Sequence, residues 1–479
     1  VKFRRVSLFE MNDIFWNRRA FLQTGVMGLG HAALVNGLCA DGSLPETGQI
    51  HSPKYVQRAK RVLFLFMKGG PSQVDTFDYK PELKRCHGRP LPFEKPKVQF
   101  AKTGNLLASP WEFKRYGECG HAVSELFPEV AKQVDDLCFI HSMHGTNPAH
   151  GAAVLKLHTG SDNFIRPSMG SWVSYGLGSE NENLPSFVSI CPTLAHGGAQ
   201  NWGSAFLPNS HQGCPIGNAS IDPKEARVGH ISNKRDTFEQ QKAQIRMIRS
   251  LNLHGSGSGL FATDRLREKI DEFEMAFRMQ TSIPLAQDLS RETQATKSLY
   301  GIDRSISENF GRQCLMARRF LESGVRFVQV THSANKAQWD QHGNLRRDHA
   351  ERAAQVDQPI AGLLLDLKAR GLLDDTLVVW AGEFGRTPTV QGPKFDGRDH
   401  NPHGFTIWFA GAGVKKGFSY GATDEFGYYA RENPVHVHDF HATLLAFLGI
   451  DHENLTYRYA GRDFRLTDVH GRVVNEIFA

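Results

Sequence analysis

Histidine and carboxylate side chains follow several short apolar runs of the sequence, and 22 histidines is a high count for 479 residues. Imidazole together with carboxylate is the ligand chemistry of zinc, manganese and other divalent first-row metals. Any one of these histidines could equally be a surface or core residue, but their recurrence after four separate runs predicts a metal site. In chain order the side chains are Ser72, Asp75 and Asp78; His141, His144 and His150; His332, Asp340 and His342; Glu383; and Asp399, His400 and His403.

The apolar runs are rich in β-branched residues and alternate with helical segments, a pattern that predicts an α/β fold with a mostly parallel sheet. In such sheets, sites form beyond the carboxyl ends of the strands, so we expect the side chains above to converge there. The predicted strands are Arg61–Met67, Asp136–Ile140, Phe187–Ile190, Val325–Thr331, Thr376–Ala381 and Phe405–Ala410. The predicted helices are Glu125–Gln133, Ala350–Arg370 and Phe440–Leu448, with a longer helix-rich section at about residues 224–323.

The first 40 residues have the pattern of an export signal. Arg18 and Arg19 precede Phe-Leu and a weakly hydrophobic segment, 24–38, which resembles a bacterial twin-arginine (Tat) signal peptide. Fifteen residues are too few to span a bilayer, and the segment lacks the 3.6-residue periodicity of an amphipathic helix. We therefore expect a Tat-type signal over 1–40, a linker over 41–59, one α/β domain over 60–479, and a periplasmic or otherwise exported protein.

Charge and cysteine content narrow the function classes further. The net charge is +6, and five basic against two acidic residues in 1–40 supply half of it, so the sequence does not favour a nucleic-acid binder. No other stretch approaches the run of about 18 apolar residues that a membrane-spanning helix needs, so we expect no stable membrane insertion of the mature protein. The six cysteines after the leader form no C-x-x-C pair, and the sequence cannot choose a disulfide pairing among them or an oligomeric state.

Six longer motifs stand out along the chain: Gly69–Asp78, Arg166–Gly178, Trp339–Asn344, Gly382–Pro388, Gly397–Phe405 and His438–Asp451. Together they resemble a known family, the bacterial domain of unknown function 1501, whose sulfatase-like proteins belong to the alkaline phosphatase superfamily. The resemblance extends from about Lys60 to the end of the chain. It implies a three-layer sandwich with a central, mostly parallel sheet. It also implies divalent metal at the strand ends and hydrolysis of phosphate or sulfate esters.

The resemblance assigns metal ligands only in part. Asp340 and His342 resemble an Asp-plus-His ligand pair, and Glu383 stands where the superfamily has the carboxylate of an Asp-His pair. His400 resembles the last metal-binding histidine, with His403 as an alternative. The usual aspartate after the first strand is replaced by a lysine, so Asp75 or Asp78 would have to substitute from farther along the loop. The implied cofactor is a divalent metal such as zinc, manganese or calcium.

The nucleophile region departs from the superfamily. The sulfatase motif C/S-x-P-x-R, whose first residue becomes formylglycine, does not occur. Counting back from Thr159-Gly160, which resembles the Thr-Gly after that motif, places His150 at the nucleophile position and Thr146 four residues earlier. Arg386 could clamp an oxyanion with two hydrogen bonds. Lys68 either favours an anionic group at the site or is a strand-end lysine pointing to solvent.

Two functions remain open at this point. The first is an exported, metal-dependent hydrolase acting on small-molecule or polysaccharide esters of phosphate or sulfate, without formylglycine. The second is a non-catalytic, metal-stabilised protein that binds an anionic polysaccharide or a partner protein, which the missing nucleophile motif favours.

Overall fold

The computed structural model describes residues 54–94, 104–229, 231–255, 264–333, 338–391 and 396–479. The predicted signal peptide and most of the predicted linker lie outside these residues.

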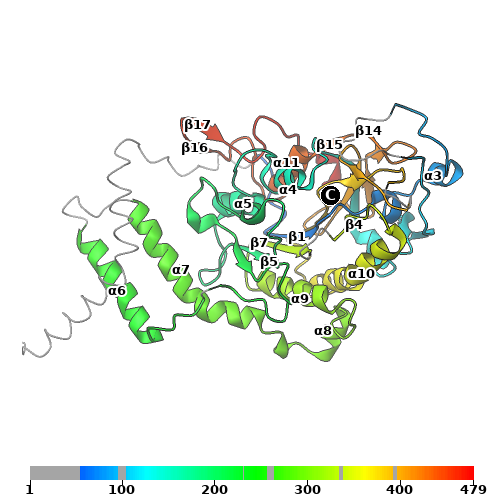
Figure 1. Cartoon of the computed structure of the whole chain (residues 1–479). Helices are drawn as coiled ribbons and strands as arrows, with labels where there is room; N and C mark the ends of the chain where they lie inside the picture. The colour runs from blue at the N-terminus through cyan, green and yellow to red at the C-terminus, as the bar shows by residue number, and fades with distance from the viewer. Residues whose placement is uncertain (1–53, 95–103, 230, 256–263, 334–337, 392–395) are drawn as a thin grey trace, which may run out of the picture. The chain divides into compact units, whose positions relative to one another are not determined.

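The fold is built on a nine-stranded mixed sheet in the order β12-β4-β11-β8-β1-β7-β5-β6, with β15 beside β4 (Figure 1). Within this described sheet only β11 runs antiparallel to its neighbours, so the α/β class with a mostly parallel sheet is confirmed. The strands are β1 Arg61–Met67, β4 Leu137–His144, β5 Phe187–Ile190, β6 Cys214–Ile216, β7 Phe327–His332, β8 Thr376–Ala381, β11 Phe405–Ala410, β12 Phe418–Tyr420 and β15 Val435–His436.

Four of the six predicted strands have the predicted bounds, and β7 is displaced by one or two residues. β4 differs more: it continues four residues past the predicted end at Ile140. The extension contains His141 and His144 and has no apolar signature, but it is paired on both sides. Met143 lies opposite Phe405 of β11, and His144 lies beside His436 of β15. Pairing with distant strands therefore sets this boundary.

The two faces of β1 show how the layers form. Val62, Phe64 and Phe66 point into one hydrophobic cluster, and the alternate residues of the strand point into the other. Fully burying one such side chain contributes about 1.5–3 kcal/mol. The first cluster contains residues of α4 (His150–Thr159), α5 (Met169–Leu177) and α11 (Val437–Phe447), and the second contains residues of α9 (Glu308–Glu322) and α10 (Leu345–Ala369). Helices thus cover both faces of the sheet, as Figure 1 shows.

The helix predicted over Glu125–Gln133 is wrong. Residues Val130–Asp136 form a 3-10 helix, η1, instead. Pro128 disfavours the α conformation at the residue before it, and the Asp357 carboxylate of α10 accepts from the backbone N–H groups of Glu129 and Val130 at 2.9 and 2.8 Å. A side chain from a distant helix therefore caps this segment.

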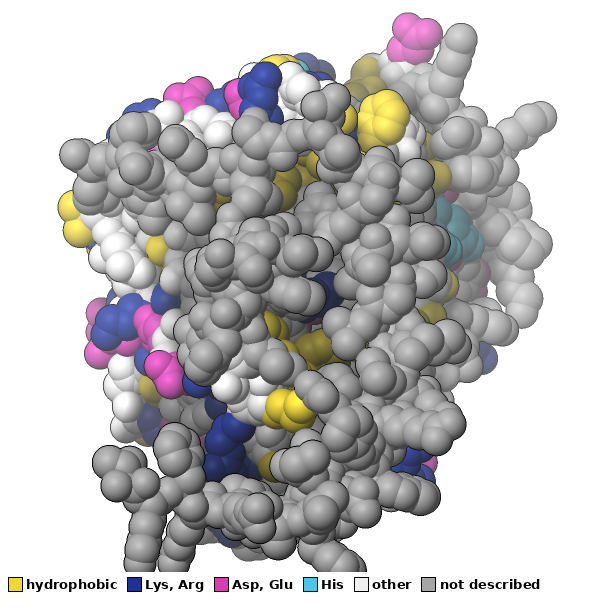
Figure 2. Space-filling view, turned by 90° about the vertical axis from the view of Figure 1, so that its left-hand side faces the viewer, with side chains coloured by type: hydrophobic (Ala, Val, Ile, Leu, Met, Phe, Trp, Pro, Cys, Tyr) yellow, Lys and Arg dark blue, Asp and Glu magenta, His cyan; other side chains and the backbone are white. Residues whose placement is uncertain are grey.

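Most of the described residues in the polar section at about 224–323 lie in helices. It contains α6 (Phe238–Gly255), α7 (Asp264–Gln287), α8 (Gln294–Leu299) and α9, with η4 (Leu289–Arg291) between α7 and α8. Arg319 of α9 donates to the backbone oxygens of Leu285 and Ala286 in α7, both at 2.8 Å. On the side of the molecule that carries α6 and α7, the described side chains include basic and acidic groups close together (Figure 2). In the part of the chain that the structure describes, no helix combines the length and apolar character needed to cross a membrane.

Short elements complete the chain. They are α2 Gln73–Thr76, α3 Pro81–Arg85, η2 Gly198–Asn201, η3 Asn209–His211, η5 Asn475–Ile477, and the paired strands β2 Phe113–Tyr116 with β3 His121–Ser124, β9 Gly385–Arg386 with β10 His400–Asn401, β13 Ala422–Thr423 with β14 Ala430–Glu432, and β16 Tyr457–Tyr459 with β17 Arg462–Phe464.

The register of the central strands aligns the loops that matter for function. Met67, the last residue of β1, lies beside His332, the last residue of β7, and Phe66 lies beside Ala381, the last residue of β8. The segments that leave these strands therefore start at the same edge of the sheet.

Candidate metal centre

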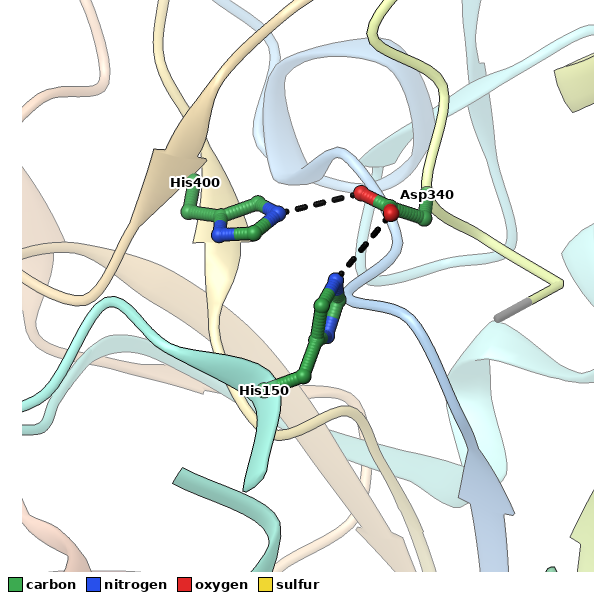
Figure 3. Close-up of side chains that lie close together, drawn as sticks. All are labelled: His150, Asp340 and His400. Carbon is green, nitrogen blue, oxygen red and sulfur yellow. Dashed lines mark hydrogen bonds and ion pairs between the residues drawn. The ribbon is translucent and has the colours of Figure 1, made fainter. Parts of the chain in front are cut away.

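Segments that follow three parallel strands, β4, β7 and β8, bring imidazole and carboxylate groups together around Asp340. His150 is the first residue of α4 and follows β4, and Asp340 and His342 follow β7. His400 opens β10, in the segment after β8. Figure 3 shows the side chains of His150 and His400 directed at the Asp340 carboxylate from different elements.

Three ring nitrogens meet the Asp340 carboxylate, and all three are Nε2. The Nε2 atoms of His342 and His400 lie 2.9 and 3.0 Å from Asp340 Oδ1, and Nε2 of His150 lies 3.2 Å from Oδ2. The ligand atoms of His150, Asp340 and His400 all lie within 4.8 Å of one another. His342, Asp399 and His400 form a second such group, so His400 belongs to both.

The opposite nitrogen, Nδ1, of each imidazole contacts an oxygen of the protein. The partners are Glu383 Oε1 for His150 at 2.7 Å, the backbone oxygen of Pro148 for His400 at 2.6 Å, and Oε1 of Gln391 for His342. A carboxylate, a carbonyl and an amide oxygen can only accept hydrogen bonds, so Nδ1 is the protonated nitrogen of each ring. Metal-binding histidines typically have this arrangement, because the bond at one nitrogen fixes the other toward the ion.

In this arrangement the negative charge of the Asp340 carboxylate faces three imidazole nitrogens and needs to be balanced. A neutral imidazole that is protonated at Nδ1 carries a lone pair at Nε2, and three such lone pairs facing a carboxylate repel it. A bound cation would remove this repulsion. Although burial lowers it, the carboxylates of Asp340 and Glu383 raise the pKa of His150, and the contact with Asp340 raises the pKa of His342. Burial lowers the pKa of His400 to about 4.

Buried polar atoms without hydrogen bonds indicate that a cation fits here. Nε2 of His150 is buried and, among the described residues, makes no hydrogen bond of acceptable geometry, although it is 3.2 Å from Asp340. Oδ2 of Asp399 is buried and equally without a partner in the described chain. Burying such groups unpaired is costly. A donor set of imidazole nitrogen and carboxylate oxygen suits zinc or manganese.

Glu383 was predicted as a metal ligand, but its carboxylate contacts His150 and does not join the converging ligand atoms. The side chain is 3% exposed, and its two oxygens accept from the backbone N–H of Gly69 at 2.9 and 3.0 Å. Burial raises its pKa, but the hydrogen bond and charge of His150 and the backbone N–H groups together outweigh this effect and hold the pKa of Glu383 below its usual value. Glu383 therefore orients His150 and is not part of either group of converging ligand atoms.

Arg386 fixes the loops around the site. Its guanidinium donates to the backbone oxygens of Gly70 at 3.0 Å and Trp339 at 3.1 Å, and to Asp340 Oδ1 at 2.6 Å. Further bonds go to the backbone oxygens of Gly69 and Arg398. All three guanidinium nitrogens are engaged in these bonds. Arg386 therefore connects the loops after β1 and β7 instead of serving as the predicted oxyanion clamp. Against the penalty of burial, the Arg386 charge and the three histidines hold the pKa of Asp340 far below its usual range.

Three of the predicted site residues are placed elsewhere. Both oxygens of Asp75 pair with the buried Arg398, at 2.6 and 3.0 Å, and Ser72 also donates to this carboxylate. Thr146 is exposed in the turn before α4. The ring of His403 packs against Tyr428 and Tyr429. The structure therefore does not bring these side chains into the groups around Asp340.

The sequence did not indicate His196 and left the role of Lys68 undecided, and both side chains lie near the centre. His196, in the loop after β5, stacks on His150 with ring centroids 5.2 Å apart and planes at 6°. A His-Gly-Gly sequence after a predicted strand was the available signal. Lys68 does not point to solvent: it is fully buried, and Nζ donates to Thr193 Oγ1 at 2.8 Å.

Residues 59–478 match the family described as "Protein of unknown function (DUF1501)". The chain belongs to the DUF1501 family. No curated protein matches it. Matching solved structures include PsFucS1 sulfatase from Pseudoalteromonas sp., with 13% identity, coverage of 83% of this chain and 69% of that one, and a TM-score of 0.36. The TAB5 alkaline phosphatase matches with 12% identity, coverage of 75% of this chain and 93% of that one, and a TM-score of 0.33. The C-terminal periplasmic domain of EcEptC from Escherichia coli, in complex with Zn, matches with 10% identity, coverage of 85% of this chain and 87% of that one, and a TM-score of 0.34. Scores this low carry no argument about the site of this DUF1501 protein, which rests on its own geometry.

Proposed function

We propose that this DUF1501 protein is an exported, metal-dependent hydrolase of phosphate or sulfate esters. The observation that carries the proposal is the set of three imidazoles around Asp340, each held at Nδ1 by a protein oxygen and directed at the carboxylate through Nε2. His150, His342, His400 and Asp340 would hold one divalent cation, with Asp399 within reach of His342 and His400.

The chemistry that such a cation supplies is Lewis acidity, which polarises an ester oxygen and lowers the pKa of water at the site. The chain's own groups keep the centre in position. Glu383 and the backbone of Pro148 fix the ring orientations of His150 and His400. Arg386 ties the loop that carries Asp340 to the loop after β1. The centre lies beyond the carboxyl ends of parallel strands, where sites of α/β proteins form.

One observation favours the non-catalytic alternative, a metal-stabilised protein that binds an anionic polysaccharide or a partner. The described hydroxyl groups of the loops are not at the centre: Thr146 is exposed in its turn, and the hydroxyl of Ser72 donates to Asp75 at 2.6 Å. His150, at the predicted nucleophile position, instead faces Asp340 among the groups that would hold the cation. Hydrolysis here would therefore use water as the nucleophile.

Metal analysis together with turnover distinguishes the two functions. The purified protein is stripped with a chelator and reloaded with zinc, manganese or calcium. It is then assayed with 4-nitrophenyl phosphate, bis(4-nitrophenyl) phosphate and 4-nitrophenyl sulfate. We expect about one bound cation for each chain and metal-dependent release of nitrophenol. Bound metal without turnover of any ester would support the binding protein instead, and absence of bound metal would contradict both functions.

A further inference from the structure

Lys68 and His196 lie beside the metal centre, and neither is needed to build it. We propose that they form an oxyanion subsite that binds a tetrahedral ester group carrying a single negative charge. The inference rests on the proposed function, because it names the class of ester that the same centre would take.

Lys68 is a buried cation with spare hydrogen-bonding capacity. Its side chain is 0% exposed, and among the described residues its ammonium donates only to Thr193 Oγ1, at 2.8 Å. An ammonium has three N–H donors, and leaving a buried charge incompletely bonded is costly. Burial lowers the pKa of Lys68, while the charges of Glu383 and Asp340 raise it, so the amine lies within electrostatic reach of the centre.

His196 presents a second unsatisfied group on the same side of the centre. Its Nδ1 atom is buried and makes no hydrogen bond within the described chain, while its ring stacks on His150. His196 lies in the same loop as Thr193, whose hydroxyl accepts from the Lys68 ammonium at 2.8 Å. A neutral imidazole still has one N–H, which can donate to an anionic oxygen.

The backbone holds His196 in this position at a cost. His196 has a φ of +53°, in the left-handed region that histidine adopts only uncommonly, and Asn201 donates to its backbone oxygen at 3.1 Å. Thr193 donates to the backbone oxygen of Ala195 while it accepts from Lys68, so one residue links the lysine to the histidine loop. Strain that the surrounding structure maintains is a feature of functional sites.

The charges around the centre select the class of ester. Asp340, Glu383 and Asp399 carry three negative charges, and Lys68 and Arg386 carry two positive ones. The buried Arg398 and Asp75 neutralise each other. With neutral imidazoles and one divalent cation, the centre has one net positive charge. A sulfate monoester or a phosphate diester balances it with one negative charge, whereas a phosphate monoester dianion carries one charge too many.

Calorimetric titration of the metal-loaded full chain tests the subsite. The probes are 4-nitrophenyl sulfate and bis(4-nitrophenyl) phosphate, which are monoanions, and 4-nitrophenyl phosphate, which is a dianion at mildly alkaline pH. For any ester that is turned over, KM is measured alongside. We expect at least one monoanion to bind more tightly than the dianion, and the stronger of the two identifies the ester. Equal or tighter binding of the dianion, or no binding of any ester, would overturn the proposal.

Lys68→Met and His196→Asn test the two residues separately. Methionine keeps the length of the side chain without the charge, and asparagine tolerates a left-handed φ. Each variant should weaken monoanion binding by about 10-fold or more, the size expected for a lost charge-assisted hydrogen bond. Both should retain metal content, because neither residue contributes a ligand, and Lys132→Met, an exposed lysine on η1, is the matched control.

The outcomes separate this inference from the proposed function. Weakened binding in both variants without turnover of any ester would keep the subsite and reject the hydrolase. Turnover with unchanged KM in both variants would keep the hydrolase and reject the subsite. Loss of metal along with ester binding in Lys68→Met would reject the subsite, because the lysine would then support the metal centre itself.

Discussion

His150 and Glu383 are joined by a hydrogen bond of 2.7 Å between Nδ1 and Oε1, and this bond decides which ring nitrogen faces the centre. Because the carboxylate can only accept, Nδ1 of His150 holds the proton and Nε2 presents its lone pair toward Asp340. Glu383 is itself fixed by the backbone N–H of Gly69, directly after β1. The backbone directly after β1 thus fixes Glu383, and Glu383 determines which nitrogen of His150, a residue that follows β4, carries the proton.

Glu383→Gln should therefore weaken metal binding without removing a ligand. The amide keeps the volume but loses the charge, and one of its ends would place an NH₂ group against the Gly69 N–H. Metal affinity should fall by about 10–100-fold, as is usual when a group that supports a ligand is changed. Calorimetric metal titration measures the affinity, and the melting temperature should fall and be partly restored by excess metal.

The control for this variant is Glu453→Gln, a glutamate whose side chain is 53% exposed. It should change neither metal affinity nor melting temperature. If Glu383→Gln retained full metal affinity, the orientation of His150 would not depend on this hydrogen bond.

Asp340 and His400 should behave as parts of one centre in a double-mutant cycle. Their side chains contact at 3.0 Å, and both belong to the same group of ligand atoms. Asp340→Asn and His400→Ala should each reduce metal content strongly, and the double variant should lose little more than either single one. Elemental analysis measures this. Independent, additive losses would show that the two residues do not share a cation.

The export prediction is tested on Arg18 and Arg19, outside the described residues. A twin-arginine signal is read through its arginine pair, so replacing both by lysine should retain the protein in the cytoplasm. Fractionation followed by immunoblotting measures the distribution, with Lys2→Arg as a control that preserves the pair. Normal export of the double lysine variant would show that the leader works by another route.

How much the sequence could predict depends on how local each feature is. β8 has the predicted bounds because a continuous apolar run, Thr376–Ala381, ends directly before a glycine. That boundary placed Glu383 at the strand end, as predicted. Its role could not be predicted, because its partners, Gly69 and His150, come from segments more than 200 residues away along the chain.

The same limit explains Arg386 and His196. The spacing of Arg386 from Glu383 suggested an anion clamp, but four of its partners are backbone oxygens, three of them from the loops after β1 and β7, which no motif records. His196 stands outside the motifs that carried the family resemblance, and its stacking on His150 connects it with the centre. Residue types and strand ends could be predicted, whereas long-range hydrogen bonds could not.

A second group of histidines, at the start of α11, predicts that the fold loses stability in acid. We call His144, His158, His436, His438, His441 and His470 the α11 histidine cluster. Burial lowers the pKa of His441 to about 3, and burial lowers that of His158 to about 4. Charged groups close to this cluster are Asp439, Lys156, Asp468 and Glu383. Nε2 of His441 and Nδ1 of His158 lie 2.7 and 2.8 Å from the backbone oxygens of Leu157 and Val154. Burial lowers the pKa of both rings more than these hydrogen bonds raise it, so both are neutral near pH 7.

The direction of the effect follows from proton linkage. An unfolded histidine titrates near pH 6.5, so below that pH the unfolded chain binds protons that the buried rings do not, and stability falls. Above about pH 6.5 there is no penalty. Between about pH 6 and 4, His441 alone should cost about 1.4 kcal/mol for each pH unit. His441→Gln should therefore lower stability at pH 7 through changed packing, but should reduce the slope of stability against pH by about one proton.

Urea unfolding of the metal-free protein at several pH values measures that slope. Removing the metal matters because the histidines around Asp340 would otherwise release it over the same range and add their own pH dependence. His87→Gln, on an exposed turn, is the control and should leave the slope of the parent protein unchanged. If His441→Gln kept the full slope, its ring would be protonated in the folded protein.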